Sequence, residues 1–367
     1  MIRKFSNWWK EVDQVIYISS IILILIGIIL SLTGTTEIRK LDYTFFIRRQ
    51  VVFAILSIFL ITFLSFQNQK FIRRISALGL IASLLLMCLI FILGYEINGS
   101  KRWLPIYGFS IQPSEFLKPF FVVISAWFLT KKLEGRDIGL KIIFILFIFS
   151  SCLLILQPDF GMTMLFMAVF FAQLFIAGLS MMLVFVLLLI LILVGLLSYY
   201  YIDNVRRRID IFFDPSSGDT YQIDQSIKAF KSGGIFGKGL GQGTLKEYIP
   251  DAHTDFIFSI AGEELGYIFC SLIIIIFLLI IIRGLLSILK KRELYSLIVV
   301  VGLLSIFGLQ AFINIASSIG ASPTKGMTLP LISYGGSSMI SSSILIGVLL
   351  SHTRGIKNRR LVRLKNE

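Results

Sequence analysis

Long, uninterrupted runs of apolar residues are the feature that most constrains the fold of this chain. The run from Val15 to Leu32 is typical, and hydrophobic residues make up 56% of the whole sequence. About 20 apolar residues carry a helix across the hydrocarbon of a bilayer, and inside lipid only helices and closed barrels satisfy their backbone hydrogen bonds. Because transmembrane β-strands alternate apolar with polar residues, these continuous runs predict an all-α integral membrane protein.

We predict ten membrane-spanning helices in a single polytopic membrane domain that covers residues 1–367. The spans are expected at residues 15–33, 47–66, 75–94, 113–130, 141–156, 160–178, 181–202, 256–282, 294–320 and 333–352. An even number of spans places both ends of the chain on one side of the membrane. Most of the 35 lysines and arginines fall in segments on the same side as the N-terminus, so the positive-inside rule predicts that both termini are cytoplasmic.

The net charge of +14 suits anionic lipid headgroups, and we expect membrane lipids rather than nucleic acid as partners. The basic stretch 353–367 is predicted to be a cytoplasmic tail that faces these headgroups. Three cysteines, Cys88, Cys152 and Cys270, lie singly inside apolar runs. Their spacing indicates neither a disulfide nor a metal site, and we expect all three to be buried.

The longest polar interruption, residues 203–255, is predicted to be a large loop on the outer side. It ends in His253-Thr254-Asp255, directly before the eighth apolar run. Two interpretations of Asp255 remain open, an N-terminal helix cap or a general base at the mouth of a membrane cavity. The repeated glycines between Gly233 and Gly243 form either a flexible loop or a cradle of backbone N–H groups for an anion.

Glutamates inside a membrane span are costly and are candidates for function. Glu263 and Glu264 lie about two turns beyond Asp255, and because neighbouring helix positions point about 100° apart, we expect one of them to face the protein interior. Lys246, in the preceding loop, is a weaker candidate for contact with an anionic group.

A second group of charges begins at the fourth span. Gln112-Pro113-Ser114-Glu115 has the pattern of a helix start, and Lys118 lies three residues after Glu115. A lysine at bilayer depth needs a partner, which Glu115 or Asp159 could supply. The pair either clamps helices together or places Lys118 near a phosphate.

Two further segments are singled out by their residue types. Arg102-Trp103 is either an interfacial anchor or a cation beside a stacking surface for a sugar. Residues 323–338, which include Ser337, combine two prolines, paired glycines and hydroxyl side chains. Irregular backbone of this kind at membrane depth is tolerated only where it is buried or lines a cavity.

The segments NGSKRWL, IQPSEFLK, QPDFG, IPDAHTDFIFSIAGEELG and LPLISYGGSS occur in this order across the predicted spans. Together they resemble the SEDS family (shape, elongation, division and sporulation), and the resemblance covers roughly residues 27–352. SPTKGMTLPLISYGGSS is more similar to the cell-division branch of this family than to its elongation branch, which is the alternative subfamily. The resemblance implies a bundle of about ten helices with a large extracytoplasmic loop between the seventh and eighth.

The resemblance also implies an activity, a location and partners. The chain would be a peptidoglycan glycosyltransferase of the bacterial inner membrane that polymerises lipid II at the division septum, with inversion at the transferred sugar. Its partners would be lipid II, a cognate class B penicillin-binding protein and other division proteins. The catalytic aspartate of the family matches Asp255, and its other functional positions match Trp103, Glu115 and Lys118.

On this basis Asp255 is predicted to act as the catalytic base. The predicted substrate-binding or cavity residues are Arg102, Trp103, Glu115, Lys118, Asp159, His253, Glu263, Glu264 and Ser337. A divalent cation, Mg²⁺ or Mn²⁺, is a candidate to help neutralise the leaving pyrophosphate, although the sequence shows no cluster of metal ligands. A lipid II flippase and a non-catalytic scaffold of the division machinery remain alternatives.

Overall fold

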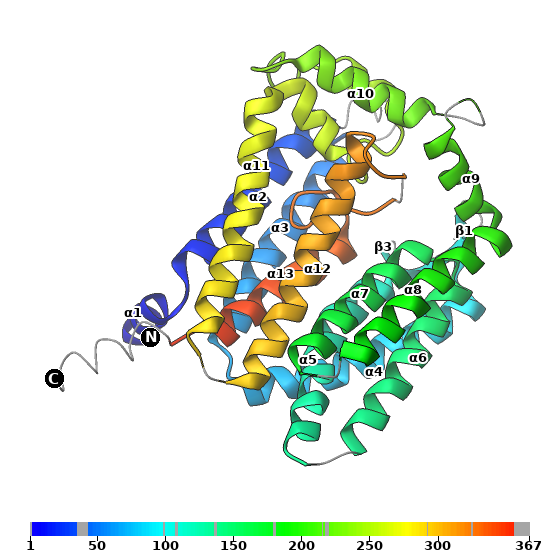
Figure 1. Cartoon of the computed structure of the whole chain (residues 1–367). Coiled ribbons are helices and arrows are strands. Elements are labelled where there is room, and N and C mark those ends of the chain that lie inside the picture. Colours follow the sequence, from blue (N-terminus) through cyan, green and yellow to red (C-terminus); the bar gives the residue numbers. More distant parts are fainter. Residues whose placement is uncertain are drawn as a thin grey trace.

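The computed structural model describes residues 2–34, 43–97, 100–106, 109–135, 138–178, 181–214, 216, 220–291, 293–323 and 326–355. Within these residues the chain is a bundle of long helices, with shorter helices at the N-terminal end and along one end of the bundle (Figure 1). Most of the basic tail predicted at 353–367 lies outside the described residues.

Each of the ten predicted spans corresponds to one helix. These helices are α2 (Gln14–Gly34), α3 (Tyr43–Phe66), α4 (Gln69–Leu93), α5 (Pro113–Leu133), α6 (Ile138–Leu156), α7 (Phe160–Ile176), α8 (Met181–Tyr201), α11 (Ile257–Leu289), α12 (Leu294–Ser318) and α13 (Gly336–Thr353). Six of the described helices, α2, α3, α4, α6, α11 and α12, are long and apolar enough to cross a membrane, and the number is up to seven if the bent pair formed by α8 and α9 (Asp203–Phe213) is one span.

Packing divides the helices into two groups (Figure 1). In one group α2 packs on α11, and α13 packs along α3; in the other, α5 packs against α4 and α6. Helix α12 joins the groups because it contacts α5, α7, α11 and α13. Large buried side chains such as Phe121, Phe170 and Phe307 fill the interior, while the apolar side chains on the outer faces are exposed, as expected of a surface that meets lipid.

Three segments differ from a simple bundle with one outer loop. An amphipathic helix α1 (Ile2–Glu11) precedes the first span. Strands β1 (Tyr95–Ile97), β2 (Ser100–Ile106) and β3 (Phe109–Ile111) form a small antiparallel sheet in the order β1-β2-β3, so the segment before α5 is not only a turn. The predicted loop 203–255 is largely helical, with α9, α10 (Tyr221–Gly233) and a 3₁₀ turn, η3 (Leu245–Tyr248).

The prediction of three buried cysteines was wrong for two of them. Cys88 and Cys152 are exposed, and only Cys270 is buried. The reason is geometric, because an apolar residue on a spanning helix can lie on the outer face and still avoid water. Apolar composition therefore does not distinguish the core from the lipid-facing surface.

Candidate functional site

Asp255 lies at the start of α11, in a segment that is fixed by the loop before α13. The backbone N–H of Tyr334 donates to the carbonyl of His253 at 3.0 Å. The Ser333 hydroxyl donates to the carbonyl of Thr254 at 2.6 Å. The rings of His253 and Tyr334 meet edge to face with their centroids 5.6 Å apart. The irregular segment that the sequence placed at membrane depth therefore holds the aspartate in position.

A buried asparagine of α12 fixes the backbone of Asp255 itself. The Asn314 side-chain amide donates to the carbonyl of Asp255 at 2.8 Å and to the carbonyl of Met327 at 2.5 Å. Gly326 lies against the carboxylate, since a Cβ atom there would be 3.2 Å from Oδ2 of Asp255. Of the two interpretations of Asp255, the N-terminal helix cap does not hold, because the N-cap of α11 is Phe256.

The electrostatic surroundings of Asp255 keep its carboxyl partly protonated near neutral pH. Burial raises its pKa to about 7; the negative charge of Asp251 also raises it, and the Arg208 guanidinium lowers it. Burial lowers the pKa of His253, so this imidazole is neutral at pH 7. A carboxylate whose pKa lies near the working pH is suited to accept a proton.

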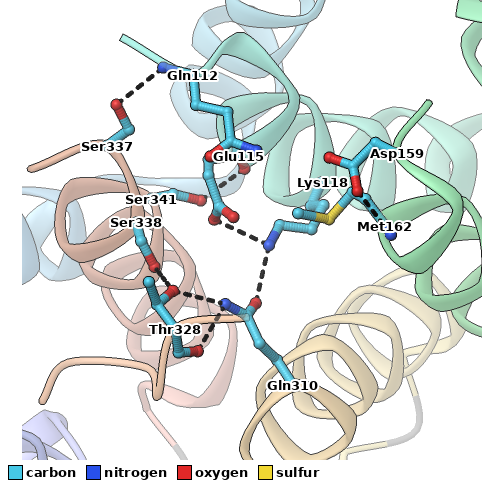
Figure 2. Close-up of polar contacts among 10 residues, drawn as sticks. All are labelled: Gln112, Glu115, Lys118, Asp159, Met162, Gln310, Thr328, Ser337, Ser338 and Ser341. Atoms are coloured by element: carbon cyan, nitrogen blue, oxygen red, sulfur yellow. Dashed lines mark hydrogen bonds and ion pairs between the residues drawn. The ribbon is translucent and has the colours of Figure 1, made fainter. Parts of the chain in front are cut away.

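Figure 2 shows a second polar group, between α5, α12 and α13. The ammonium of Lys118 is 2.9 Å from Glu115 and 2.8 Å from the side-chain oxygen of Gln310. The Gln310 amide donates in turn to the carbonyl and hydroxyl oxygens of Thr328, at 3.2 and 3.3 Å. Lys118 is only 2% exposed, so its charge is neutralised by Glu115 rather than by Asp159.

The starts of α5 and α13 meet beside this group (Figure 2). The backbone N–H of Gln112 donates to the Ser337 hydroxyl at 3.0 Å, and the Ser341 hydroxyl donates to the carbonyl of Glu115 at 2.7 Å. The hydroxyls of Thr328 and Ser338 form a short hydrogen bond. Because Thr328 follows Gly326 by two residues, the Lys118 group and the Asp255 segment share one loop.

Arg102 and Asp159 form a pair of their own. Arg102 lies 3.5 Å from the carboxylate of Asp159 and donates to the carbonyls of Gln157 and Pro158. Asp159 also caps α7 by accepting from the backbone N–H of Met162 at 3.3 Å. These contacts join β2 to the turn between α6 and α7. Arg102, Asp159 and Asp255 each lie close enough to Arg208 for their charges to act on it.

Trp103 lies in β2 opposite Tyr95 of β1 and is partly buried. Within the described part of the chain, the Trp103 ring makes no ring contact that would place it beside Asp255. Its role as a stacking surface stays a prediction.

Both glutamates of α11 are buried, whereas helix geometry predicted that one of them would face the interior. Glu263 accepts from the backbone N–H groups of Thr244, Leu245 and Lys246 at 2.9, 3.0 and 3.0 Å. Glu264 pairs with the Lys246 ammonium at 2.6 Å, with that side chain 1% exposed. The loop covers both carboxylates, which removes Lys246 from the candidates for anion contact.

The glycine-rich stretch has a third role that the sequence did not suggest. Helix α11 is kinked at Gly266, where φ is +78°, and the kink frees carbonyl groups in the preceding turn. The carbonyls of Glu263 and Glu264 accept from the N–H groups of Lys238 and Gly239, at 3.0 and 2.9 Å. A Cβ atom on Gly237 would lie 2.2 Å from the Glu264 carbonyl oxygen, so glycine permits this close approach.

Sequence reasoning missed Asn314 and Gln310, although Asn314 donates to the carbonyl of Asp255 and Gln310 accepts from Lys118. A signal was present, since Asn314 and Gln310 are uncharged polar residues inside an apolar run. Such residues need hydrogen-bond partners in lipid. Only the fold could show that their partners are the Asp255 segment and Lys118.

No group of three or more His, Cys, Asp or Glu side chains among the described residues is arranged to hold a metal ion.

The FtsW/RodA/SpoVE family, described as cell cycle proteins, matches residues 13–358. The chain is 35% identical over 353 residues to a probable peptidoglycan glycosyltransferase FtsW of Caulobacter vibrioides, covering 95% of this chain and 90% of that one. It is 34% identical over 360 residues to stage V sporulation protein E of Bacillus subtilis, covering 93% and 97%.

Two solved structures share the fold. The first is a chain from a structure described as structural coordination of polymerization and crosslinking by a peptidoglycan synthase complex. It matches with a TM-score of 0.75 and 26% identity, covering 93% of this chain and 97% of that one. The other is the rod shape determining protein RodA of Thermus thermophilus, with a TM-score of 0.66 and 27% identity, covering 91% and 95%.

Proposed function

This chain belongs to the FtsW/RodA/SpoVE family of cell cycle proteins, and we propose that it polymerises lipid II into glycan strands with Asp255 as the general base. Relatives that match most of its length are named peptidoglycan glycosyltransferase FtsW, and the chain is an enzyme of this class with a role in septal cell-wall synthesis. The assignment of the base, the membrane orientation and the partners are our inferences.

One observation carries the assignment of the base. Asp255 has a pKa of about 7, while its own carbonyl and those of His253 and Thr254 are all held by hydrogen bonds from α12 and from the loop before α13. The carboxylate is thus able to take a proton near neutral pH and is attached to a fixed backbone. Preorganisation of this kind contributes to catalysis by orienting the reacting groups.

In the proposed reaction the 4-hydroxyl of the acceptor sugar attacks the anomeric carbon of the donor. Asp255 accepts the hydroxyl proton as the new carbon–oxygen bond forms, and the bond between the anomeric carbon and the diphosphate oxygen breaks. The configuration at that carbon is inverted. The leaving diphosphate takes the electron pair and requires nearby positive charge, for which Arg102 and Arg208 are candidates.

A polymerisation assay tests the base. Purified wild type and Asp255→Asn would each be incubated with lipid II, and the products resolved as glycan ladders on a gel. We expect ladders from the wild type and none from Asp255→Asn. The matched control is Asp251→Asn, an exposed carboxylate four residues away at φ +54°, a conformation that asparagine tolerates. Ladders of normal length from Asp255→Asn would assign the proton transfer to another group.

The same assay separates the alternative functions. Each sample would be prepared with and without a class B penicillin-binding protein whose transpeptidase site is inactivated. Lipid II movement across vesicles that survives in Asp255→Asn, without ladders from any sample, would favour a flippase. Folded protein that binds the partner but neither moves nor polymerises lipid II would favour a scaffold.

We propose that both termini are cytoplasmic and that Asp255 faces the outer side of the inner membrane. The positive-inside rule supports this orientation, and so does the chemistry, since the glycan strand is made outside the cytoplasm. A cysteine introduced at Glu247 should be labelled by a membrane-impermeant reagent in intact cells, and a cysteine introduced at Lys10 should not be labelled. Labelling at Lys10 rather than Glu247 would reverse the orientation.

A further inference from the structure

The first turn of α13 lies next to the Asp255 segment. Its N-cap is Gly335, which has no side chain that could cap the helix. The N-terminal end of a helix carries partial positive charge and unpaired N–H donors. Tyr334, directly before this turn, is bonded to the His253 carbonyl, which places the turn beside the proposed base.

A buried glutamine of α3 faces the same end of α13. The two helices run parallel in register, since the Phe53 ring packs on Gly336 and the Ser57 hydroxyl lies 3.5 Å from the carbonyl of Met339. Gln50 lies one turn before Phe53 on α3, so the same register places it beside the residues that lead into α13. Gln50 is 2% exposed, and both polar atoms of its amide lack a hydrogen-bond partner.

The burial of Gln50 without hydrogen-bond partners costs folding free energy, and a purely structural role does not explain that cost. A buried amide with neither donor nor acceptor satisfied destabilises a fold, and leucine would fill similar space without that penalty. A ligand oxygen at the end of α13 would accept from the Gln50 amide and from the N–H groups of the first turn.

Two further features favour an anionic ligand. Arg49, the neighbour of Gln50, hydrogen-bonds the side chain of Tyr334 and brings a cation to this end of α13. The start of α5, also without a side-chain cap, is joined to the turn through Ser337 (Figure 2). In its first turn the Ser114 hydroxyl is 1% exposed and lacks a partner.

The carboxylate of Glu115, in the first turn of α5, does not oppose an anion, because it is neutralised by the Lys118 ammonium at 2.9 Å (Figure 2). The starts of two helices and an arginine therefore lie close together, with an unpartnered amide one turn from Phe53 on α3. Helix N-termini with free N–H groups bind phosphate groups in this way.

We propose that the first turn of α13, with Gln50 and Arg49 of α3, binds the diphosphate of the lipid-linked donor sugar. The proposal rests on the proposed function, and it assigns the leaving group to a fixed place beside Asp255. The charge that develops on the diphosphate as the sugar bond breaks would be received by the helix end, where oriented N–H groups need no reorganisation.

The test uses Gln50→Leu in the full-length chain, reconstituted in phosphatidylcholine nanodiscs. Farnesyl diphosphate is the titrant that carries a lipid-linked diphosphate, and inorganic diphosphate and farnesol are the two halves of that molecule. Gln67→Leu is the matched control, since it makes the same change just beyond the other end of α3, where its amide donates only to the Phe63 carbonyl. Binding is measured by calorimetry and stability by thermal unfolding without ligand.

We expect wild type and Gln67→Leu to bind farnesyl diphosphate alike, and Gln50→Leu to bind it about tenfold more weakly, the effect of one lost hydrogen bond to a charged group. Farnesol should bind all three equally. Unliganded Gln50→Leu should unfold at the same or a higher temperature than wild type. A lower unfolding temperature would show that Gln50 has a structural partner, and equal affinities would remove it from the site; either result overturns the proposal.

Two other arms distinguish the source of the phosphate. Inorganic diphosphate that binds as tightly as farnesyl diphosphate would overturn the lipid-linked assignment. Loss of farnesyl diphosphate binding when the nanodiscs contain phosphatidylglycerol would assign the site to a phospholipid headgroup instead. Glycan ladders formed from lipid II by the same samples report the enzyme activity separately. If the wild type polymerises lipid II but Gln50→Leu binds farnesyl diphosphate as tightly as the wild type, the diphosphate site is refuted and the proposed function is not.

Discussion

Glu263→Gln is the substitution whose effect follows most directly from the structure. The Glu263 carboxylate is fully buried and accepts two backbone N–H groups on one oxygen and the N–H of Lys246 on the other. Glutamine keeps one oxygen but replaces the second with an NH₂ group, which cannot accept. The Lys246 N–H would then face another donor inside the protein.

The cost can be worked out from these contacts. A hydrogen bond to a charged group is worth about 1.5–3 kcal/mol, and an orphaned buried donor costs about 1–3 kcal/mol. The two remaining bonds also lose their charge assistance. We take about 3 kcal/mol as the local loss, with no addition for Lys238, whose partly exposed ammonium lies 3.4 Å away and is screened by solvent.

Hydrogen exchange followed by mass spectrometry measures this loss where it occurs. A local cost of about 3 kcal/mol corresponds to a roughly 100-fold rise in the population of the open segment. We expect faster exchange at η3 in Glu263→Gln and unchanged exchange in α5. Glu247→Gln is the matched control, since Glu247 lies in the same 3₁₀ turn and is exposed. Exchange at η3 that is equal in the two variants would refute the reasoning.

Four further predictions concern Asp255, Lys246 and Gly326. Polymerisation should fall as the pH drops below about 7, because the carboxyl of Asp255 is then protonated, and a flat rate from pH 6 to pH 8 would contradict this. Since a raised carboxyl pKa stabilises the fold at acid pH and this contribution is lost as the pH rises through about 7, Asp255→Asn should unfold at a higher temperature than wild type at pH 8. Lys246→Met leaves Glu264 buried without its partner and should lower the free energy of unfolding by about 3–5 kcal/mol, measured by chemical unfolding. The double variant Lys246→Met with Glu264→Leu should recover most of that loss. Gly326→Ala introduces a Cβ at φ +60°, 3.2 Å from Oδ2 of Asp255, and should lower kcat with little change in KM. A variant with a normal kcat would show that the carboxylate tolerates displacement.

The sequence by itself determined the helices and the residues on which chemistry could depend. Each predicted span falls on one helix, because a segment in lipid must satisfy its own backbone and has few alternatives to a helix. The family also followed from the sequence, since ordered motifs around Trp103, Glu115, Asp159 and Asp255 extend through the chain. Charged and polar residues among apolar ones are conspicuous, so Lys118 and Asp255 could be singled out.

Only the tertiary structure decided what those residues touch. Lys118 had two possible partners by sequence. It pairs with Glu115 of its own helix, and the packing of α5 against α12 brings Gln310 to its other side, whereas Asp159 pairs with Arg102. Glu263 and Glu264 serve the loop that covers them, since the kink in α11 frees carbonyl groups for that loop to bind. Periodicity within one helix contains no information about a segment that folds back over it.

The surroundings of the proposed base were decided in the same way. Asn314 and Ser333 hold the Asp255 segment from positions 59 and 79 residues away, and the register of α3 on α13 places Gln50 one turn before the residue that packs on Gly336. Such contacts depend on how helices distant in sequence pack together. Local composition fixes which segments become helices in lipid, whereas the packing of those helices sets the surroundings of the aspartate and, through them, its pKa.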